Sequence, residues 1–209
     1  MSPADPYVYQ GTEVLINKFG FCNQNELDRA ESDFTVLKLA VLAENPLSGN
    51  YDVAHLREIH KYIFEDIFDW AGDFRTINIE KSEQALVGLS VEYSDYCSIE
   101  NDLEYIFAEM RSAQWTGLIL EKKAALFTAQ IARLWKIHPF REGNTRTITH
   151  FYCQYYDSRN EQINRKLFEQ NAEYFRAALV AANAVFKDIG DKSDTRFLYN
   201  IVLDAMHTA

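Results

Sequence analysis

The stretch from Ile137 to Arg146 constrains this chain most, because it joins two helical patterns through a short polar loop. Apolar residues recur at helical spacing on both sides: Leu126, Ala129, Ile131, Ala132, Leu134 and Trp135 before it, and Ile148, Phe151, Tyr152 and Tyr155 after it. Pro139 disfavours the α conformation in the residue before it, which predicts that the first helix ends at His138. Gly143 then permits a tight turn into the second helix. The stretch is therefore predicted to be a helix-loop-helix.

The start of the second predicted helix has the properties of an anion site. Its first turn, from Asn144 to Arg146, presents unpaired backbone N–H groups and the positive end of the helix dipole. Such a turn binds phosphate well. Arg146 adds a permanent positive charge whose donors lie in a planar fork, and Asn144 is suited both to capping the helix and to contacting a phosphate.

Two further residues of the loop suggest chemistry at that phosphate. The carboxylate of Glu142 would repel phosphate oxygens directly, but Mg²⁺ commonly takes one or two carboxylates together with substrate phosphates. His138 has an ordinary pKa of roughly 6.5, which suits a general base. The loop thus predicts a base, a metal ligand and a phosphate-binding helix start.

The run His138-x-Phe140-x-Glu142-Gly143-Asn144-x-Arg146 resembles the core motif of Fic domains, H-x-F-x-[D/E]-G-N-G-R-x-x-R. A second segment, from Leu56 to Arg75, resembles the family's recurrent helix that ends in Trp-Ala-Gly and an arginine. The resemblance extends from about Asp5 to the C-terminus. It implies an all-α fold, a helical bundle with a small β-hairpin flap over the active site.

For activity, the resemblance implies transfer of AMP from ATP to a hydroxyl group of a Tyr, Thr or Ser in a target protein. His138 would be the base and Glu142 would hold Mg²⁺, which makes Mg²⁺ the expected cofactor and ATP the expected substrate. Phosphate binding would involve Gly143, Asn144, Thr145 and Arg146, the last of these also as a catalytic residue. The flap would pair with an extended segment of the target protein by adding a strand, and its expected docking residues are Ile79, Glu80, Lys81 and Leu86.

Two departures from the motif leave other readings open. Thr145 replaces the third glycine, where its hydroxyl is placed to bond a phosphate oxygen or its methyl to crowd the site. Thr149 replaces the final arginine, which in the family contacts the terminal phosphates of ATP. One alternative is a Fic-type transferase that uses another donor, such as CDP-choline or UTP. The other is an interaction domain with impaired catalysis.

Regulation is a further expectation from the resemblance. Many Fic proteins are inhibited by a helix that carries [S/T]-x-x-x-E-[G/N], and this chain contains no such sequence. Thr149 also removes the arginine that the inhibitory glutamate would bind. The expectation is constitutive activity, or control by a small, separate, antitoxin-like protein that docks on the N-terminal helices. A toxin, a bacterial effector and a housekeeping modifier remain equally open as biological roles.

Composition narrows the class of protein. A length of 209 residues predicts a single domain, 1–209. The net charge of −10 argues against nucleic acid as a partner. Three scattered cysteines favour reduced thiols, and no apolar run is long enough for a membrane span. With Asp5 and Pro6 interrupting any leader-like segment, the expected location is cytoplasmic, with delivery into another cell left open.

The remaining segments are predicted from periodicity and breakers. Residues 1–11 are expected to form an extended arm, 73–92 the hairpin flap, and 138–149 the active-site loop with the helix start. Helices are expected at 12–19, 24–44, 53–69, 95–113, 121–136, 144–157, 170–187 and 194–207, with a looser turn at 161–166.

Overall fold

The computed structural model describes residues 5–209, so the first four residues of the expected arm lie outside the described part. Its helices are α1 (Gln24–Glu44), α2 (Val53–Phe64), α3 (Ile99–Ser112), α4 (Leu120–Ile137), α5 (Asn144–Asp157), α6 (Arg165–Gln170), α7 (Ala172–Ala182) and α8 (Arg196–His207). Two 3₁₀ turns, η1 (Gln84–Leu86) and η2 (Tyr96–Ser98), and one two-stranded sheet, β1 (Val185–Phe186) with β2 (Gly190–Asp191), complete the elements. The all-α fold class is confirmed.

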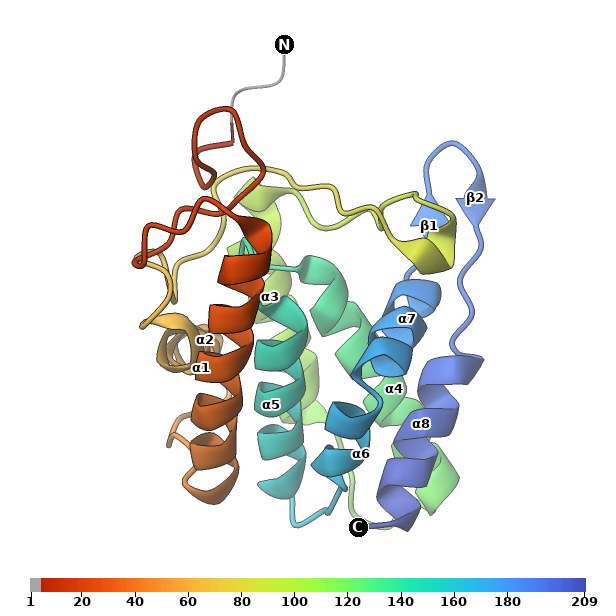
Figure 1. Cartoon of the computed structure of the whole chain (residues 1–209). Coiled ribbons are helices and arrows are strands. Elements are labelled where there is room, and N and C mark those ends of the chain that lie inside the picture. The colour runs from red at the N-terminus through yellow and green to blue at the C-terminus, as the bar shows by residue number, and fades with distance from the viewer. Residues whose placement is uncertain (1–4) are drawn as a thin grey trace.

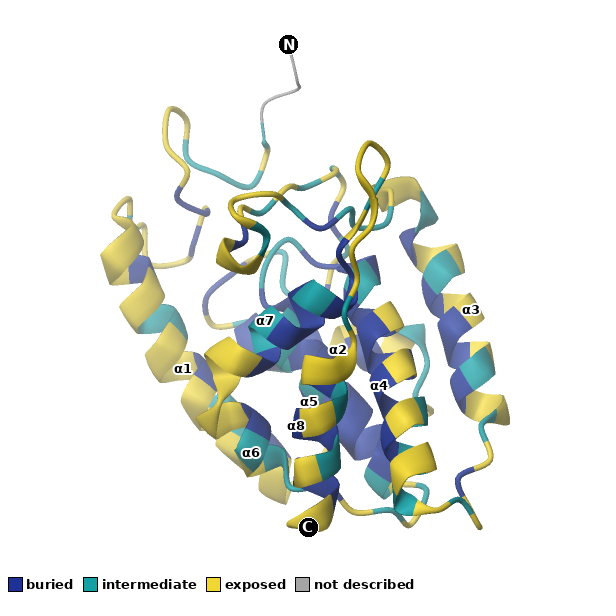
Figure 2. Ribbon diagram, turned by 90° about the vertical axis from the view of Figure 1, so that its right-hand side faces the viewer, coloured by how far each residue is buried: buried dark blue, intermediate teal, exposed yellow. Residues whose placement is uncertain are grey.

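Helix α5 is the centre of the bundle, and α1 and the α6–α7 pair flank it on opposite sides (Figure 1). It packs against α2 and α4, and most of its residues are buried, among them Ile148, Phe151 and Tyr155. The outer helices bury one face each and expose the other (Figure 2). Burial on most sides of the helix also encloses polar residues, among them Thr147, His150 and Gln154.

The loop between α4 and α5 lies at the same end of the bundle as residues 5–23 (Figure 1). Helix α4 ends at Ile137, because His138 adopts the left-handed conformation with φ of 50° before Pro139. Gly143, with φ of 77°, caps α5. The predicted helix end, the turn and the helix start are all confirmed.

The predicted helix at 12–19 is wrong. The backbone N–H of Tyr9 donates to Val14 O (3.0 Å) and that of Ile16 to Tyr7 O (2.8 Å), so the segment folds back on itself around a turn instead of coiling. Elsewhere the predicted helices exist, α1 and α5 with the predicted ends and the others with shifted ends. Helix α2 stops at Phe64, five residues early, where turn-type bonds such as Ile67 N to Phe64 O replace the helical pattern.

The segment 73–92 crosses above the start of α5 and reaches α7 through η1 (Figure 1), as a flap should, but it forms no paired strands. Side chains and isolated turn bonds replace a ladder: Lys81 N donates to Ser90 Oγ (3.0 Å) and Glu83 N to Leu89 O (3.1 Å). The expected β-hairpin at this position is therefore corrected to a loop. The small sheet lies at β1–β2 instead.

Candidate active site

The loop is braced from inside by its own asparagine. Asn144 is 2% exposed, and its side chain accepts a hydrogen bond from Phe140 N (2.9 Å) and donates one to Phe140 O (2.7 Å). This pair of bonds satisfies both backbone groups of a buried residue. The amide side chain is thus occupied with the loop, which leaves the backbone of the first turn of α5 to face an anion.

His60 of α2 braces the loop from below. Its Nδ1 accepts from Gly72 N (2.8 Å), so its Nε2 carries the hydrogen and donates to Glu142 O (3.1 Å). Its ring stacks on Phe140 at 3.7 Å between centroids. Burial lowers the pKa of His60 to about 3, which keeps it neutral. The structure therefore gives this histidine a supporting role and no proton chemistry.

His138 is placed as a neutral base. Its Nδ1 lies 3.3 Å from the carbonyl oxygen of Trp135, which only accepts, so Nδ1 carries the hydrogen and Nε2 keeps its lone pair. Nε2 is buried and has no partner within residues 5–209. The ring stacks on Tyr93 at 4.0 Å. Burial, then the nearby charge of Lys81, lowers the pKa of His138 well below its ordinary value.

Arg75 holds the loop and the flap together, a role that motif matching did not assign. It is 2% exposed, and its guanidinium donates to the carbonyl oxygens of His138 (Nε, 2.9 Å), Ile77 (2.7 Å) and Ser94. Its own backbone N–H donates to Pro139 O (2.9 Å). One buried side chain thus fixes the backbone of the base, of Ile77 near the start of the flap and of Ser94 just past its end. The signal in the sequence was a lone arginine after a tryptophan-glycine turn.

Glu142 lies at the edge of the loop with an ionised carboxylate. One oxygen accepts from Gly143 N (2.9 Å) and the other from Lys81 Nζ (2.7 Å). Burial raises the pKa of this carboxyl, but the positive charge of Lys81 and these hydrogen bonds outweigh it, and the pKa is lowered overall. Gly143 is required here, because a Cβ would lie 2.2 Å from the ring of Phe64.

The donor set fits a magnesium ion that shares its coordination with a phosphate. No group of three or more His, Cys, Asp or Glu side chains within the described chain is arranged to hold a metal. A lone ionised carboxylate such as Glu142 suits Mg²⁺, which usually takes one or two carboxylates and completes its shell with phosphate oxygens and water.

Arg146 does not point toward His138 in this structure. Its guanidinium pairs with Glu31 of α1, donates to Thr35 Oγ1 (3.1 Å) and lies 4.9 Å from the centroid of Phe64. Glu31 therefore balances the charge of this arginine in the first turn of α5, and no bound anion is needed to explain its position. Its role in phosphate binding stays a prediction.

Thr145 and the flap form a second polar group beside the base. Thr145 Oγ1 accepts from Trp135 Nε1 (2.9 Å) and lies 3.5 Å from Nη1 of Arg176, on α7. Arg176 also pairs with Glu83 of the flap (2.6 Å), whose other contact is the hydroxyl of Tyr93 (3.4 Å). Nothing in the sequence singles out Glu83, Tyr93 or Arg176, because no motif links residues so far apart.

The expected docking residues of the flap differ in placement. Lys81 is turned inward to Glu142, with 17% of its side chain exposed. Leu86 packs against the core, Ile79 is half-buried and Glu80 is exposed. The docking role of these four residues stays a prediction.

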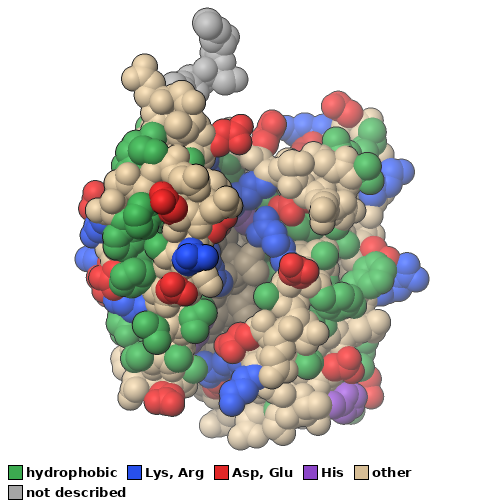
Figure 3. Space-filling model, viewed as in Figure 1, with side chains coloured by type: hydrophobic (Ala, Val, Ile, Leu, Met, Phe, Trp, Pro, Cys, Tyr) green, Lys and Arg blue, Asp and Glu red, His purple; other side chains and the backbone are tan. Residues whose placement is uncertain are grey.

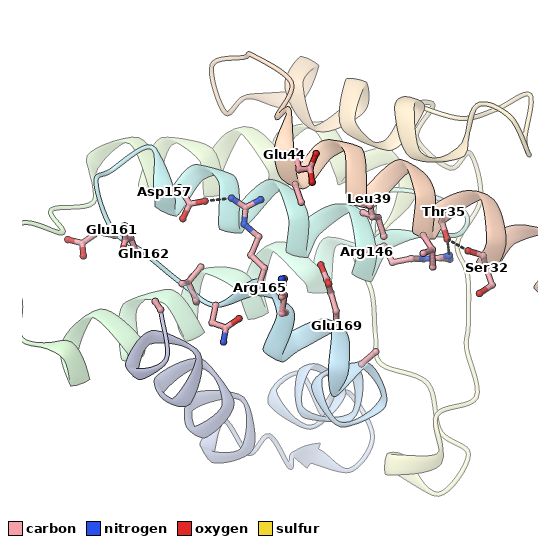
Figure 4. Close-up of a pocket in the computed structure, with 18 of the residues that line it drawn as sticks. Ser32, Thr35, Leu39, Glu44, Arg146, Asp157, Glu161, Gln162, Arg165 and Glu169 are labelled. Atoms are coloured by element: carbon pink, nitrogen blue, oxygen red, sulfur yellow. Dashed lines mark hydrogen bonds and ion pairs between the residues drawn. The ribbon is translucent and has the colours of Figure 1, made fainter.

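A cleft of about 1400 Å³ lies next to the loop, between α1, α5 and the segment around α6. The space-filling view shows the molecule hollowed there, over α5 (Figure 3). In the close-up, Arg146 and Thr35 stand at one end and the Asp157–Arg165 pair at the other (Figure 4). The lining includes neither His138 nor Glu142, so the cleft adjoins the loop without containing its chemistry.

Comparison with known proteins finds similar chains. A model of the Fic/DOC family matches residues 50–156. The chain is 36% identical over 146 residues to a probable protein adenylyltransferase, y4lH, of Sinorhizobium fredii, covering 68% of this chain and 70% of the relative. It is 32% identical over 151 residues to the protein adenylyltransferase VbhT of Bartonella schoenbuchensis, covering 72% of this chain but 30% of VbhT.

The fold has a close match among solved structures. BepC, a VirB-translocated effector of Bartonella tribocorum crystallised with bound AMPPNP, aligns with a TM-score of 0.77 over 95% of each chain at 20% identity. At that identity the likeness is one of fold. Within the described residues, no helix has the length and apolar character needed to cross a membrane.

Proposed function

Because this chain belongs to the Fic/DOC family, we propose that it is a protein adenylyltransferase that transfers AMP from Mg-ATP to a Tyr, Thr or Ser hydroxyl of a target protein. The observation that carries the proposal is the state of His138. Its Nδ1 carries the hydrogen, so Nε2 has a free lone pair, and this buried atom has no hydrogen-bond partner among the described residues. Support comes also from relatives that are named protein adenylyltransferases, and from BepC, which was crystallised with AMPPNP.

In the proposed reaction, the hydroxyl oxygen of the target attacks the α-phosphorus of ATP. The bond from that phosphorus to the oxygen bridging to the β-phosphate breaks, pyrophosphate leaves, and His138 Nε2 takes the proton of the hydroxyl. Burial favours the neutral imidazole, so the base is ready to accept a proton at neutral pH. The left-handed backbone of His138 and the hydrogen bond from Arg75 to its carbonyl oxygen fix the position of this residue. Positioning contributes much of the catalysis in such transfers.

Charge on the nucleotide would be met from two sides. The first-turn N–H groups of α5, from Asn144 to Arg146, would face the phosphate oxygens with the positive end of the helix dipole. Glu142 would hold Mg²⁺ with those oxygens, and bound Mg²⁺ supplies positive charge against the negative charge of the phosphates. For this, Lys81 must leave the carboxylate of Glu142 that it contacts at 2.7 Å.

The flap is proposed as the docking site for the target protein. Its backbone runs across the site without a paired strand (Figure 1), and among the described residues the N–H groups of Ile77 to Glu80 have no hydrogen-bond partner. An extended segment of the target would bond to them, as in strand addition. Such docking would place a target hydroxyl near His138, and Ile79 and Leu86 offer apolar contacts beside it. A small, separate inhibitory protein is proposed as a second partner, supported by the cleft that α1 lines next to Arg146.

The test is transfer of label from α-³²P-ATP to protein in a bacterial or host lysate. The purified chain should label a band with Mg²⁺, and His138→Ala should abolish the labelling while its thermal unfolding stays cooperative. His207→Ala is the matched control, since His207 is exposed on α8 and distant from the proposed chemistry. Undiminished labelling by His138→Ala would remove His138 from the mechanism.

The same protein separates the alternatives. If Mg-ATP does not bind in calorimetry but CDP-choline or UTP does, the loop serves another donor. If no Mg²⁺–nucleotide binds, the chain is an interaction domain. One observation favours that second reading: both Glu142 and Arg146 already have charged partners within the protein. An inhibitor would be sought by co-purification from the source cell, and by loss of labelling when it is added back.

A further inference from the structure

We propose that Arg176 of α7 is an additional phosphate-binding residue of the nucleotide site, held by Glu83 of the flap until the nucleotide arrives. The inference rests on the proposed function, because it needs a nucleotide whose phosphates lie at the start of α5. It assigns a role to a residue outside the motif, on α7, which is separated from the motif's helix α5 by α6.

The loop's own cations leave room for such a residue. The guanidinium of Arg146 is turned to α1, where Glu31 and Thr35 bind it. Thr149 supplies no charge at the end of the motif. Lys81 is paired with Glu142. A triphosphate therefore needs a further positive charge at the start of α5 if it is to be bound by more than backbone N–H groups.

Arg176 stands where that charge is needed. Its Nη1 lies 3.5 Å from the hydroxyl of Thr145, the second residue of α5, whose own N–H belongs to the unpaired first turn. The charge of Arg176 is also among the causes that depress the pKa of His138, after burial and Lys81, which places it near the imidazole. Its side chain is 35% exposed, so solvent and a ligand have access to it.

Glu83 holds Arg176 against the flap when no nucleotide is bound. The side chain of Glu83 is only 9% exposed, and its carboxylate accepts hydrogen bonds from Nη2 of Arg176 (2.6 Å) and from the hydroxyl of Tyr93 (3.4 Å). Tyr93 in turn stacks on His138. A phosphate offers the same guanidinium a more highly charged acceptor, in the fork geometry that arginine favours. Exchange of Glu83 for phosphate would bind the nucleotide and release this contact of the flap.

The experiment is titration calorimetry of Mg-ATP into the full chain and three variants. Arg176→Gln should weaken binding about tenfold, the worth of one charge-assisted hydrogen bond. Glu83→Gln should tighten binding several-fold, because it frees the guanidinium. The double variant should bind like Arg176→Gln alone. Opposite signs from the two ends of one ion pair are what a merely structural pair does not give.

Controls make each outcome decisive. Competition by adenosine, which lacks phosphates, should not change in Arg176→Gln. Arg133→Gln and Glu109→Gln disrupt an exposed pair between α4 and α3 and should leave Mg-ATP binding as it is. If Arg176→Gln does not fold, Arg176→Lys, which keeps the charge and loses the fork, should show an intermediate loss, and Glu83→Gln still tests the sign.

The failures are distinguishable. Wild-type affinity in Arg176→Gln, or equal weakening by Arg176→Gln and Glu83→Gln, would overturn the role of Arg176 while nucleotide binding by the wild type keeps the proposed function. A wild-type chain that binds no nucleotide at all would overturn both.

Discussion

The loop that carries His138 and the flap that covers it are held in opposite ways. The loop depends on buried bonds of neutral groups, such as those of Asn144 to Phe140 and of His60 to the carbonyl of Glu142. The flap is held to the rest of the site largely by ion pairs, Lys81 with Glu142 and Glu83 with Arg176. Arg75 is the exception, since it bonds to both regions.

The difference has a functional meaning. When a buried hydrogen bond between neutral groups opens, neither group finds another partner. Such a bond therefore fixes the geometry of the loop. An ion pair that is partly exposed contributes little to stability and can trade one partner for another ion. The loop is therefore built to stay in place and the flap to yield to a charged ligand. Three predictions test this contrast, beginning with the largest effect.

Gly143→Ala should destabilise the loop more than any change in the flap. The added Cβ would lie 2.2 Å from Phe64 in the core, and φ of 77° is itself unfavourable for alanine. The expected loss in the free energy of unfolding is about 3 kcal/mol, measured by urea denaturation. Gly117→Ala is the matched control, because Gly117 has φ of 82° with open space around it, and it should cost only about 1 kcal/mol. Equal losses would mean that the loop has room to yield.

Acidification should weaken the loop's supports before it affects the flap. Burial lowers the pKa of His60 to about 3 and that of His150 to about 4, and lowers that of His138 as well, against roughly 6.5 in the unfolded chain. These histidines stay neutral in the folded state while the unfolded chain takes up protons. Stability is thus fully present above pH 6.5 and falls as the pH drops toward the folded values.

Between pH 6 and pH 5, protonation of the unfolded chain at His60 and at His150 should each cost about 1 kcal/mol of stability. Glu142, whose folded pKa is depressed, loses its own contribution only below about pH 4.3. His60→Gln should lower stability at neutral pH but flatten the decline on acidification, as urea titrations at each pH would record. His207→Gln, at an exposed position, should leave the slope unchanged. An unaltered slope in His60→Gln would contradict a neutral, buried His60.

Sequence predicted the loop far better than the flap, for a physical reason. Helices α1 and α5 begin and end at the predicted residues, and their starts are set locally by the caps Asn23 and Gly143. The flap's structure depends on partners that periodicity cannot reveal, since Glu83 and Arg176 are 93 positions apart. The segment was predicted to be a hairpin, but its hydrogen bonds go to side chains, to the α4–α5 loop and to isolated turns instead.

The site showed the same division. Motif residues His138, Glu142 and Gly143 lie together at the loop as expected, because they are neighbours in the chain. The side-chain direction of Arg146 was not predictable, since it is set by Glu31, which lies on α1. The motif predicts which chemical groups lie close together in the loop. Which of these groups have a partner elsewhere in the protein, as Arg146 has in Glu31, depends on the helices packed around the loop.

The smallest expected effect belongs to Lys81→Gln, which removes one ion pair of the flap. Glu142 keeps its bond from Gly143 N, and 29% of its side chain is exposed, so the free energy of unfolding should fall by less than about 1 kcal/mol. Hydrogen exchange should nevertheless accelerate at the amides of Lys81 and Glu83, while the amide of Phe140 stays protected by Asn144.

Lys123→Gln is the control, since Lys123 and Glu161 form a pair of similar exposure away from the flap, and it should leave exchange at Lys81 and Glu83 unchanged. Faster exchange at Phe140 in Lys81→Gln would mean that the flap's ion pairs also hold the loop. The two regions would then open together, and a ligand that displaced Lys81 would disturb the base it is meant to reach. If the amide of Phe140 stays protected while those of Lys81 and Glu83 exchange faster, the loop remains ordered while the flap opens.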